Sequence, residues 1–312
     1  DPQSYLAYID GIGMSSLKTE EEKESMIFSA AEQIFLSGNY EKAIAALQSY
    51  MKEYPSGKGV PSAEFYLGES YRGLGQKEQA CDRYYAVMES GSGSYLELAA
   101  LRFSELTYSL QRYADSYRGY AFLLEKAVMD ENTAVARIGM MRSAYAGRMY
   151  AEAVENAAAV EADRRSDEAL LTEAEYITAK SYLYMSQRDK ALPILHRLSS
   201  RPDTDYGAEA AYLLIQDSYD RGDFSDVETR VYAFSESENP QQYWLARSFV
   251  VLGDAFAEMG DYEQAKATFE SVRDGYNPDR PDDVKDNLDI RIQKLEELMS
   301  SGTVTETGTD TL

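Results

Sequence analysis

Apolar residues recur along most of the chain with the three- and four-residue spacing of amphipathic helices. The run Ala63–Leu74 shows this pattern before a turn at Gly75, and the run Tyr262–Val272 shows it after another turn. Glycine accepts the backbone geometry that a turn between two antiparallel helices requires. The pattern therefore predicts an all-α protein built from helix pairs.

A short motif accompanies these turns and recurs seven times. It consists of a turn residue, usually glycine, followed by an aromatic residue, an acidic or polar residue and a small residue that we call the anchor. Gly38-Asn-Tyr-Glu-Lys-Ala43 and Gly260-Asp-Tyr-Glu-Gln-Ala265 are almost the same string, and the looser fourth copy begins at Gly147. The spacing of 36 to 38 residues predicts seven copies of one helix–turn–helix unit, with anchors at Ala43, Ala80, Ser116, Ala153, Ala191, Val227 and Ala265.

Two further positions predict how the helices of a pair pack. A small residue twelve before the anchor lets the helices approach closely, and a larger apolar residue usually follows four after it. Met141 and Ile215 depart from the first rule, so we expect looser packing in the fourth and sixth repeats. The small residues are Ala31, Gly68, Ser104, Ala179 and Gly253, and the larger ones are Leu47, Tyr84, Tyr120, Leu195, Val231 and Phe269, with Ala157 as the exception.

These residues resemble the tetratricopeptide repeat over about residues 24–278. The resemblance implies a right-handed α-solenoid of about seven helix pairs, in which the first helix of each pair lines a concave groove for a peptide or protein ligand. The present repeat is longer than the usual ~34 residues. Its Tyr-Pro-Ser ending and Pro-Ser-Ala-Glu restart resemble bacterial envelope proteins such as the Tol–Pal-associated coordinator of cell division and lipoprotein D of the barrel-assembly machinery.

The two ends of the chain differ from the repeats. We predict an N-terminal segment or remnant of an earlier repeat over residues 1–22 and a repeat array over residues 23–280. Residues 281–299 are expected to form a capping helix, because Val284, Leu288, Ile292, Leu295 and Leu298 make one apolar stripe. The small and polar residues 300–312 are expected to form a disordered tail.

Composition restricts the kind of function. The chain has 312 residues and a net charge of −23, which disfavours binding to nucleic acid phosphates or anionic lipid. Cys81 is the single cysteine and His196 the single histidine, so no disulfide or multi-histidine metal site can form within the chain, and we expect no metal or cofactor. We expect structural or solvent-facing roles for both residues. No run of apolar residues is long enough to span a membrane.

Candidate ligand-binding residues follow from the family resemblance. Eleven residues before the anchors stand Glu32, Glu69, Glu105, Arg142, Lys180, Gln216 and Asp254, so two cations follow one another in an acidic chain. We predict that Arg142 and Lys180 bind an acidic group or a C-terminal carboxylate, with Tyr108, Tyr145 and Tyr184 around them. The alternative is that both cations neutralise neighbouring glutamates. The complete predicted groove set is Arg72, Tyr108, Arg142, Tyr145, Lys180, Tyr184 and Tyr219.

The predicted function is a non-enzymatic scaffold for a peptide or protein partner in a bacterial cell-envelope assembly. We expect neither nucleic acid binding nor a direct membrane span, and a homo-oligomer remains open. The envelope resemblance favours a periplasmic location over a cytoplasmic one. The alternative function is an all-helical α/α toroid that hydrolyses glycosidic bonds with paired carboxylates, which requires a closed pocket and a carboxyl group of raised pKa.

Overall fold

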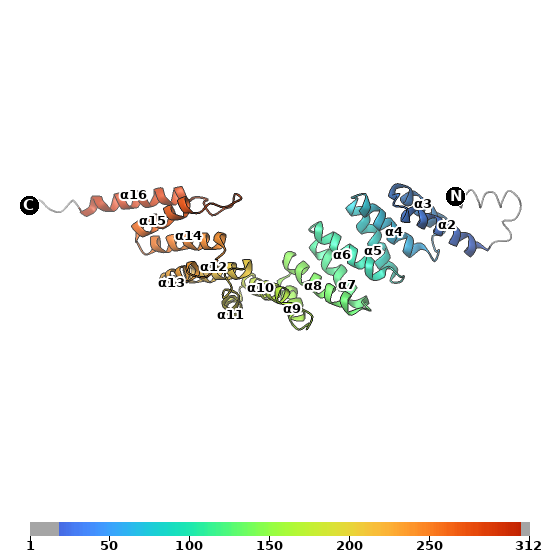
Figure 1. Cartoon of the computed structure of the whole chain (residues 1–312), viewed down its shortest axis with the longest axis horizontal. Coiled ribbons are helices and arrows are strands. Elements are labelled where there is room, and N and C mark those ends of the chain that lie inside the picture. Colours follow the sequence, from blue (N-terminus) through green and yellow to red (C-terminus); the bar gives the residue numbers. More distant parts are fainter. Residues whose placement is uncertain (1–18, 307–312) are drawn as a thin grey trace, which may run out of the picture. The chain divides into compact units, whose positions relative to one another are not determined.

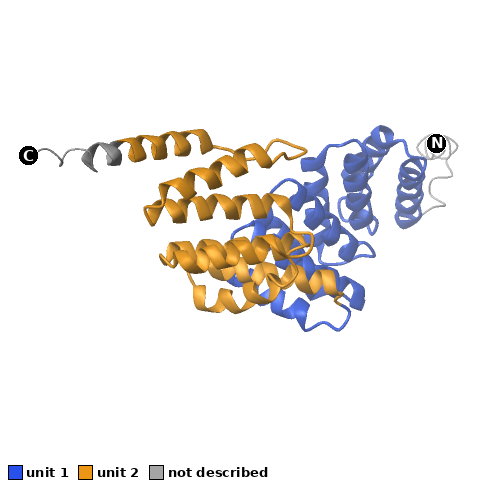
Figure 2. Ribbon diagram, turned by 60° about the vertical axis from the view of Figure 1, so that its left-hand side comes forward, with its two compact units in different colours: residues 1–165 blue, residues 166–312 orange. Residues whose placement is uncertain are grey.

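The computed structural model describes residues 19–306, with the side chains described as far as residue 300. This part of the chain contains fifteen helices and no strand (Figure 1). The chain divides into two compact units, residues 1–165 and 166–312 (Figure 2), and each unit is described by itself.

Unit 1 contains four helix pairs, and unit 2 contains three pairs and a final single helix. We call the first helix of each pair the A helix and the second the B helix. The helices of unit 1 are α2 (Glu20–Leu36), α3 (Tyr40–Glu53), α4 (Val60–Gly73), α5 (Lys77–Ser90), α6 (Leu96–Ser109), α7 (Tyr113–Lys126), α8 (Asp130–Ala146) and α9 (Tyr150–Glu161). Those of unit 2 are α10 (Glu168–Tyr184), α11 (Arg188–Leu198), α12 (Asp205–Asp220), α13 (Phe224–Ser235), α14 (Gln242–Glu258), α15 (Tyr262–Gly275) and α16 (Leu288–Glu306).

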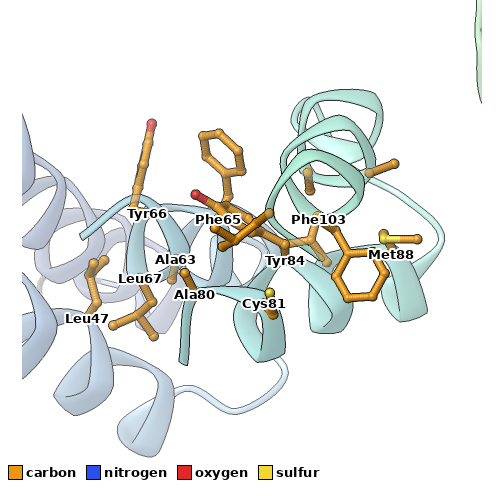
Figure 3. Packing of buried hydrophobic residues seen from close by; sticks show 14 of the residues in the cluster. Leu47, Ala63, Phe65, Tyr66, Leu67, Ala80, Cys81, Tyr84, Met88 and Phe103 are labelled. Carbon is orange, nitrogen blue, oxygen red and sulfur yellow. The ribbon is translucent and has the colours of Figure 1, made fainter. Parts of the chain in front are cut away.

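Successive helices pack against one another throughout each unit, which confirms the predicted all-α solenoid of helix pairs. The anchor residue lies near the start of every B helix, and all seven anchors are completely buried. Apolar side chains from successive helices surround the anchors, as Ala63, Leu67 and Tyr84 do around Ala80 in the second repeat (Figure 3). The anchor is therefore a point of close contact in every pair.

The small residue twelve before the anchor faces the large residue four after it. In the second repeat, a Cβ atom on Gly68 would lie 2.6 Å from the ring of Tyr84. In the seventh repeat, a Cβ atom on Gly253 would lie 2.4 Å from the ring of Phe269. Both distances are shorter than real Cβ contacts, so glycine is what allows these rings to lie between the two helices.

The expected looser packing of the fourth and sixth repeats has different outcomes. In the fourth repeat, Met141 and Ala157 are both completely buried, so a large residue on the A helix is matched by a small one on the B helix and the expectation was wrong. In the sixth repeat, Ile215 is buried but lines a small open cavity of about 180 Å³ between α12 and α13. The large residue on the A helix is therefore compensated by a small residue in the fourth repeat, whereas the packing around Ile215 in the sixth repeat is incomplete.

The A–B turn has the same backbone conformation in all seven repeats. The residue five before the anchor has a positive φ of 59° to 80° at Gly38, Gly75, Gln111, Arg148, Ser186, Gly222 and Gly260. In the fourth repeat the left-handed residue is Arg148, so the choice of Gly147 as the turn residue was one position early. The next residue ends the turn and precedes the B helix. In three repeats this residue is Asn39, Asp223 or Asp261, and its side chain accepts a hydrogen bond from a backbone N–H of the B helix.

The final helix differs from the prediction at both ends. It begins at Leu288 instead of near residue 281, because Asn287 has a φ of 64° that interrupts a helix. Val284, Leu288, Ile292 and Leu295 are buried as the apolar stripe predicts, but Leu298, its last residue, is 39% exposed. The helix continues to Glu306, so the predicted tail begins as helix, and residues 307–312 and 1–18 lie outside the described residues.

Replacing Gly253 with leucine should separate α14 from α15. The leucine side chain would occupy the space of the Phe269 ring, and we expect a loss of roughly 1–3 kcal/mol or more in the free energy of unfolding. Urea denaturation followed by circular dichroism measures this loss. Gly275→Ala is the control, because a Cβ atom there meets no other atom within 4 Å. Equal midpoints for the two variants would contradict the proposed packing.

Replacing Gln111 with glycine should stabilise unit 1. A non-glycine residue in the left-handed region costs about 1–2 kcal/mol in the folded state. Glycine removes this cost, but it also makes the unfolded chain more flexible, which offsets part of the gain in stability. We therefore expect a gain of about 0.5–1 kcal/mol from Gln111→Gly and a loss of similar size from Gly75→Ala at the equivalent turn. Thermal and urea denaturation of the two variants test the opposite signs.

Candidate interaction site

The carboxylates at the predicted ligand-facing position join neighbouring A helices. Tyr66 of α4 donates a 2.6 Å hydrogen bond to Glu32 of α2, and Arg291 of α16 pairs with Asp254 of α14. Polar contacts of this kind fix the distance between successive A helices within a unit. The acidic members of the predicted face therefore have a structural role.

Glu69 is the centre of a network that includes one predicted ligand-binding residue. Its carboxylate lies 2.5 Å from Nη2 of Arg72 and accepts a 2.6 Å hydrogen bond from Tyr84. Nε of Arg102 lies 3.6 Å from the same carboxylate. Burial favours the neutral acid, but these donors outweigh it and lower the pKa of Glu69. Arg72 is thus held against α4 by Glu69.

A pocket of about 400 Å³ opens between α6 and α8, with Tyr120 of α7 beneath it. We call it the α6–α8 pocket. The Tyr120 side chain is 8% exposed, and a Cβ atom on Gly139 would lie 2.4 Å from its ring. Glycine at this position leaves room for the ring and for the pocket above it. The residues that line the pocket are Glu105, Tyr108, Tyr120, Val135, Ile138, Gly139 and Arg142.

Two predicted ligand-binding residues, Tyr108 and Arg142, lie together on the wall of this pocket. Tyr108 is 38% exposed, and its ring packs at 5.2 Å against Tyr113. Burial raises the pKa of Tyr120 to about 12, with the charge of Glu105 acting in the same direction and that of Arg142 opposing it. The pocket thus offers an apolar interior with one carboxylate and one guanidinium at its wall.

Exposed apolar side chains gather around the same helices. Of twelve large exposed apolar side chains in the described part of the chain, five lie between residues 98 and 135, at Leu98, Tyr108, Val128, Met129 and Val135. The backbone N–H of Val128 donates a 3.4 Å hydrogen bond to Glu97, so this loop is tied to α6. Asn132 at the start of α8 donates a 2.7 Å hydrogen bond to the same carboxylate.

Three of the four A helices of unit 1 together carry a small excess of positive charge at the predicted ligand-facing positions, whereas the fourth, α2, carries Glu32 there. At the positions fourteen, eleven and eight before the anchors, α4, α6 and α8 carry three arginines and two glutamates, namely Arg72, Arg102, Arg142, Glu69 and Glu105. This excess of one positive charge contrasts with the net charge of −23 of the whole chain. Local electrostatics here favour an anionic group of a ligand.

Lys180 of unit 2 has a carboxylate partner in the next repeat. Its Nζ lies 2.6 Å from Glu209 of α12, and both side chains are only 15% exposed. Tyr176 donates a 2.7 Å hydrogen bond to the same carboxylate, and the Lys180 ammonium lies 5.9 Å and 5.7 Å from the ring centres of Tyr176 and Tyr184. Lys180 is therefore the neutralising cation of the alternative interpretation. Tyr184 is 55% exposed.

The remaining predicted tyrosines brace the A–B turn. Tyr145 packs at 6.4 Å against Tyr150, and Tyr219 packs at 5.7 Å against Phe224. Phe35 with Tyr40 and Tyr108 with Tyr113 repeat the same five-residue spacing. Arg142 and Lys180 belong to different units, so a joint site of the two stays a prediction.

Sequence reasoning missed two elements of this surface. The first is Gly139, which stands fourteen before its anchor where other repeats have larger residues such as Tyr66, Arg102 and Ile177. This departure is visible in the repeat alignment and could have indicated the pocket. The second is Glu209, the partner of Lys180, which no local pattern singles out.

The reactive residues considered in the sequence have structural surroundings. Cys81 is 1% exposed, and burial raises the pKa of its thiol to about 11, whereas His196 is exposed. Burial also raises the pKa of Glu64 and of Asp254, but each pairs with an arginine, Arg83 and Arg291. Within residues 19–306 no group of three or more metal-ligating side chains is found. No helix of this range combines the length and apolarity that crossing a membrane requires.

Models of known families match three segments of the chain. Tetratricopeptide repeat models match residues 25–57 and 62–90, which cover most of the first two helix pairs, and residues 246–272, within the last pair. The chain carries tetratricopeptide repeats. No protein with a curated description matches the sequence.

Two solved tetratricopeptide repeat structures illustrate the similarity. A protein from Parabacteroides merdae is 15% identical over 88% of this chain and 98% of its own, with a TM-score of 0.43. YrrB, described as having an unusual peptide-binding site, is 17% identical over 67% of this chain and 98% of its own, with a TM-score of 0.45.

Raising the pH above 10 should destabilise the protein through its buried tyrosines. The pKa of Tyr120 is about 12 in the folded chain against an ordinary value of 10, so its stabilising contribution is complete below pH 10 and disappears as the pH rises to 12. Tyr66 and Tyr84 shift in the same direction, through burial and their hydrogen bonds to glutamates. We expect the free energy of unfolding to fall by about 1 kcal/mol between pH 10 and 11 from Tyr120 alone, with further losses from Tyr66 and Tyr84.

Urea denaturation at several pH values, with tyrosinate absorbance recorded in parallel, measures this dependence. Tyr120→Phe is the matched control, and its curve should be less steep. A Tyr120→Phe variant with the dependence of the unchanged chain would show that Tyr120 ionises normally.

Proposed function

We propose that the protein is a non-enzymatic scaffold that binds a peptide segment of a protein partner at the α6–α8 pocket. The observation that carries this proposal is the pocket itself, which joins Tyr108 and Arg142 to an apolar interior inside unit 1. Ligand sites of this kind combine apolar walls with a few polar groups that fix orientation.

The chemistry of the pocket suggests which groups it binds. An apolar side chain would lie against Tyr120, Val135 and Ile138, and a carboxylate of the same segment would pair with the guanidinium of Arg142. Tyr108 offers a flat ring with a hydroxyl group beside them. The surrounding excess of arginine supports an acidic group or a C-terminal carboxylate.

The other predicted groove residues would contribute in different ways. Arg72, Tyr145, Lys180, Tyr184 and Tyr219 are not among the residues that line the α6–α8 pocket. Arg72 and Tyr145 would support the surface of unit 1, and Lys180, Tyr184 and Tyr219 would belong to a separate contact surface of unit 2.

The cellular context is a separate part of the proposal. We infer a bacterial cell-envelope assembly and a periplasmic location from the Tyr-Pro-Ser ending of the repeats, with a cytoplasmic location as the alternative. The toroid hydrolase has less support, because the carboxyl groups of raised pKa are paired with arginines. Association of two copies through a repeat face is compatible with the scaffold.

Changing Arg142 to glutamate should remove the carboxylate contact and abolish capture of the partner. The measurement is affinity capture from a bacterial envelope extract and from a cytoplasmic extract, with the unchanged chain and Arg142→Glu as baits. We expect at least about tenfold less of one partner on Arg142→Glu, which corresponds to 1.4 kcal/mol. Lys52→Glu, an exposed lysine on α3, makes the same charge change elsewhere in unit 1 and should leave capture unchanged.

Val135→Gln tests the apolar half of the pocket without changing charge. Val135 is 40% exposed, so this variant should fold normally and still capture less partner. Lys180→Glu is unsuitable as a test of binding, because it would place two carboxylates together at Glu209 and destabilise unit 2. A partner retained equally by Arg142→Glu and Val135→Gln would move the binding surface elsewhere.

A further inference from the structure

The connection between α15 and α16 is twice as long as any other B-to-A connection of the described chain. Residues 276–287 make twelve residues, whereas the other connections have three to six. Each A helix begins 20 to 23 residues before its anchor. The repeat spacing of 36 to 38 residues, counted from Ala265, places the next anchor position at residues 301–303. An eighth A helix would therefore begin between residues 278 and 283, but α16 begins at Leu288. Its first one or two turns are missing.

A cavity of about 850 Å³ lies between the first half of α14, the end of α15 and the start of this connecting segment. Ala246 and Val272 at its base are buried, and Leu245 and Phe249 are half-buried. Tyr243 and Tyr276 stand at its sides. The cavity thus has the apolar base that the starting turns of an amphipathic A helix would cover.

Specific contacts hold the connecting segment beside the cavity. Tyr243 donates a 2.9 Å hydrogen bond to Asp283, and Nη1 of Arg247 lies 3.0 Å from the same carboxylate. Tyr276 donates a 2.6 Å hydrogen bond to Asp282, and Val284 is buried beyond it. Asp283 thus anchors the segment to α14, and the Tyr276–Asp282 hydrogen bond closes a loop within the segment.

The charge around the cavity is negative. The connecting segment, residues 276–287, contains four aspartates, one arginine and one lysine, a net charge of −2, and Asp279 lies on the cavity wall. Arg247 of α14 pairs with one of these aspartates, Asp283. A ligand that covers the apolar base would therefore find anionic groups along its outer side.

We propose that this cavity binds a short amphipathic helix of a protein partner that carries lysine or arginine on its polar face. The apolar face of that helix replaces the missing turns against Leu245 and Phe249, and its cations face the aspartates of the connecting segment. This is the helix-in-groove mode of recognition. The site is independent of the α6–α8 pocket and lies in the other unit.

The test uses the full chain and a fluorescein-labelled amphipathic peptide of leucine and lysine, about 14 residues or four turns long. Fluorescence anisotropy gives its dissociation constant, and a leucine–glutamate peptide of the same pattern serves as the charge control. We expect the lysine peptide to bind and the glutamate peptide to bind at least about tenfold more weakly. Equal binding of the two peptides, or no binding of the lysine peptide, would overturn the proposal.

Gly275→Phe locates the binding. Gly275 lines the cavity, and a Cβ atom there meets nothing within 4 Å, so the added ring can fill the cavity without disturbing the fold. Glu53→Phe places the same ring at the last residue of α3 in unit 1 and is the matched control. We expect about tenfold weaker binding for Gly275→Phe and unchanged binding for Glu53→Phe. Unchanged binding in both variants would show that the peptide binds non-specifically to the negative surface of the protein, and it would refute the site.

Discussion

The close approach of the two helices in each pair is the constraint on which the rest of the structure depends. An anchor that is completely buried and a glycine that leaves room for a facing ring, as Gly68 does for Tyr84, bring the helix axes near each other. The turn must then be short, and one of its residues adopts a left-handed conformation in every repeat. With the pair fixed in this way, the same positions of each A helix meet the neighbouring A helix, and a ligand surface can be built on them.

A chain with many more carboxylates than cations must stabilise some carboxylates without a positively charged partner. Tyrosine does this here, because its hydroxyl group donates a hydrogen bond without adding charge. Tyr66, Tyr84 and Tyr176 each donate to a glutamate on an A helix at 2.6 to 2.7 Å. Charge-assisted hydrogen bonds of this kind are stronger than those between neutral groups. They hold the acidic face together without adding positive charge to it.

The sequence predicts those features of the fold that depend on periodicity. Helix pairs, anchors and the glycine–ring contacts follow from residues a fixed distance apart, and Tyr108 and Arg142 could be placed on one face for the same reason. Features that depend on a distant partner could not be predicted. The pairing of Lys180 with Glu209, 29 residues further along the chain, is one such feature. The late start of α16 depends on the backbone of Asn287 and on contacts of Asp283, which an apolar stripe does not reveal.

Both proposed binding surfaces lie where one repeat departs from the others. Gly139 removes a side chain that most A helices carry at the same position, and the α6–α8 pocket opens above Tyr120. The shortened start of α16 removes one or two helical turns, and a larger cavity remains against α14. An unfilled apolar cavity forfeits contacts and therefore lowers stability. Regular repeats avoid this loss because each repeat buries the apolar surface of its neighbour. Where a side chain or helical turn of the repeat is missing, an apolar surface is exposed, and a partner can bury it instead.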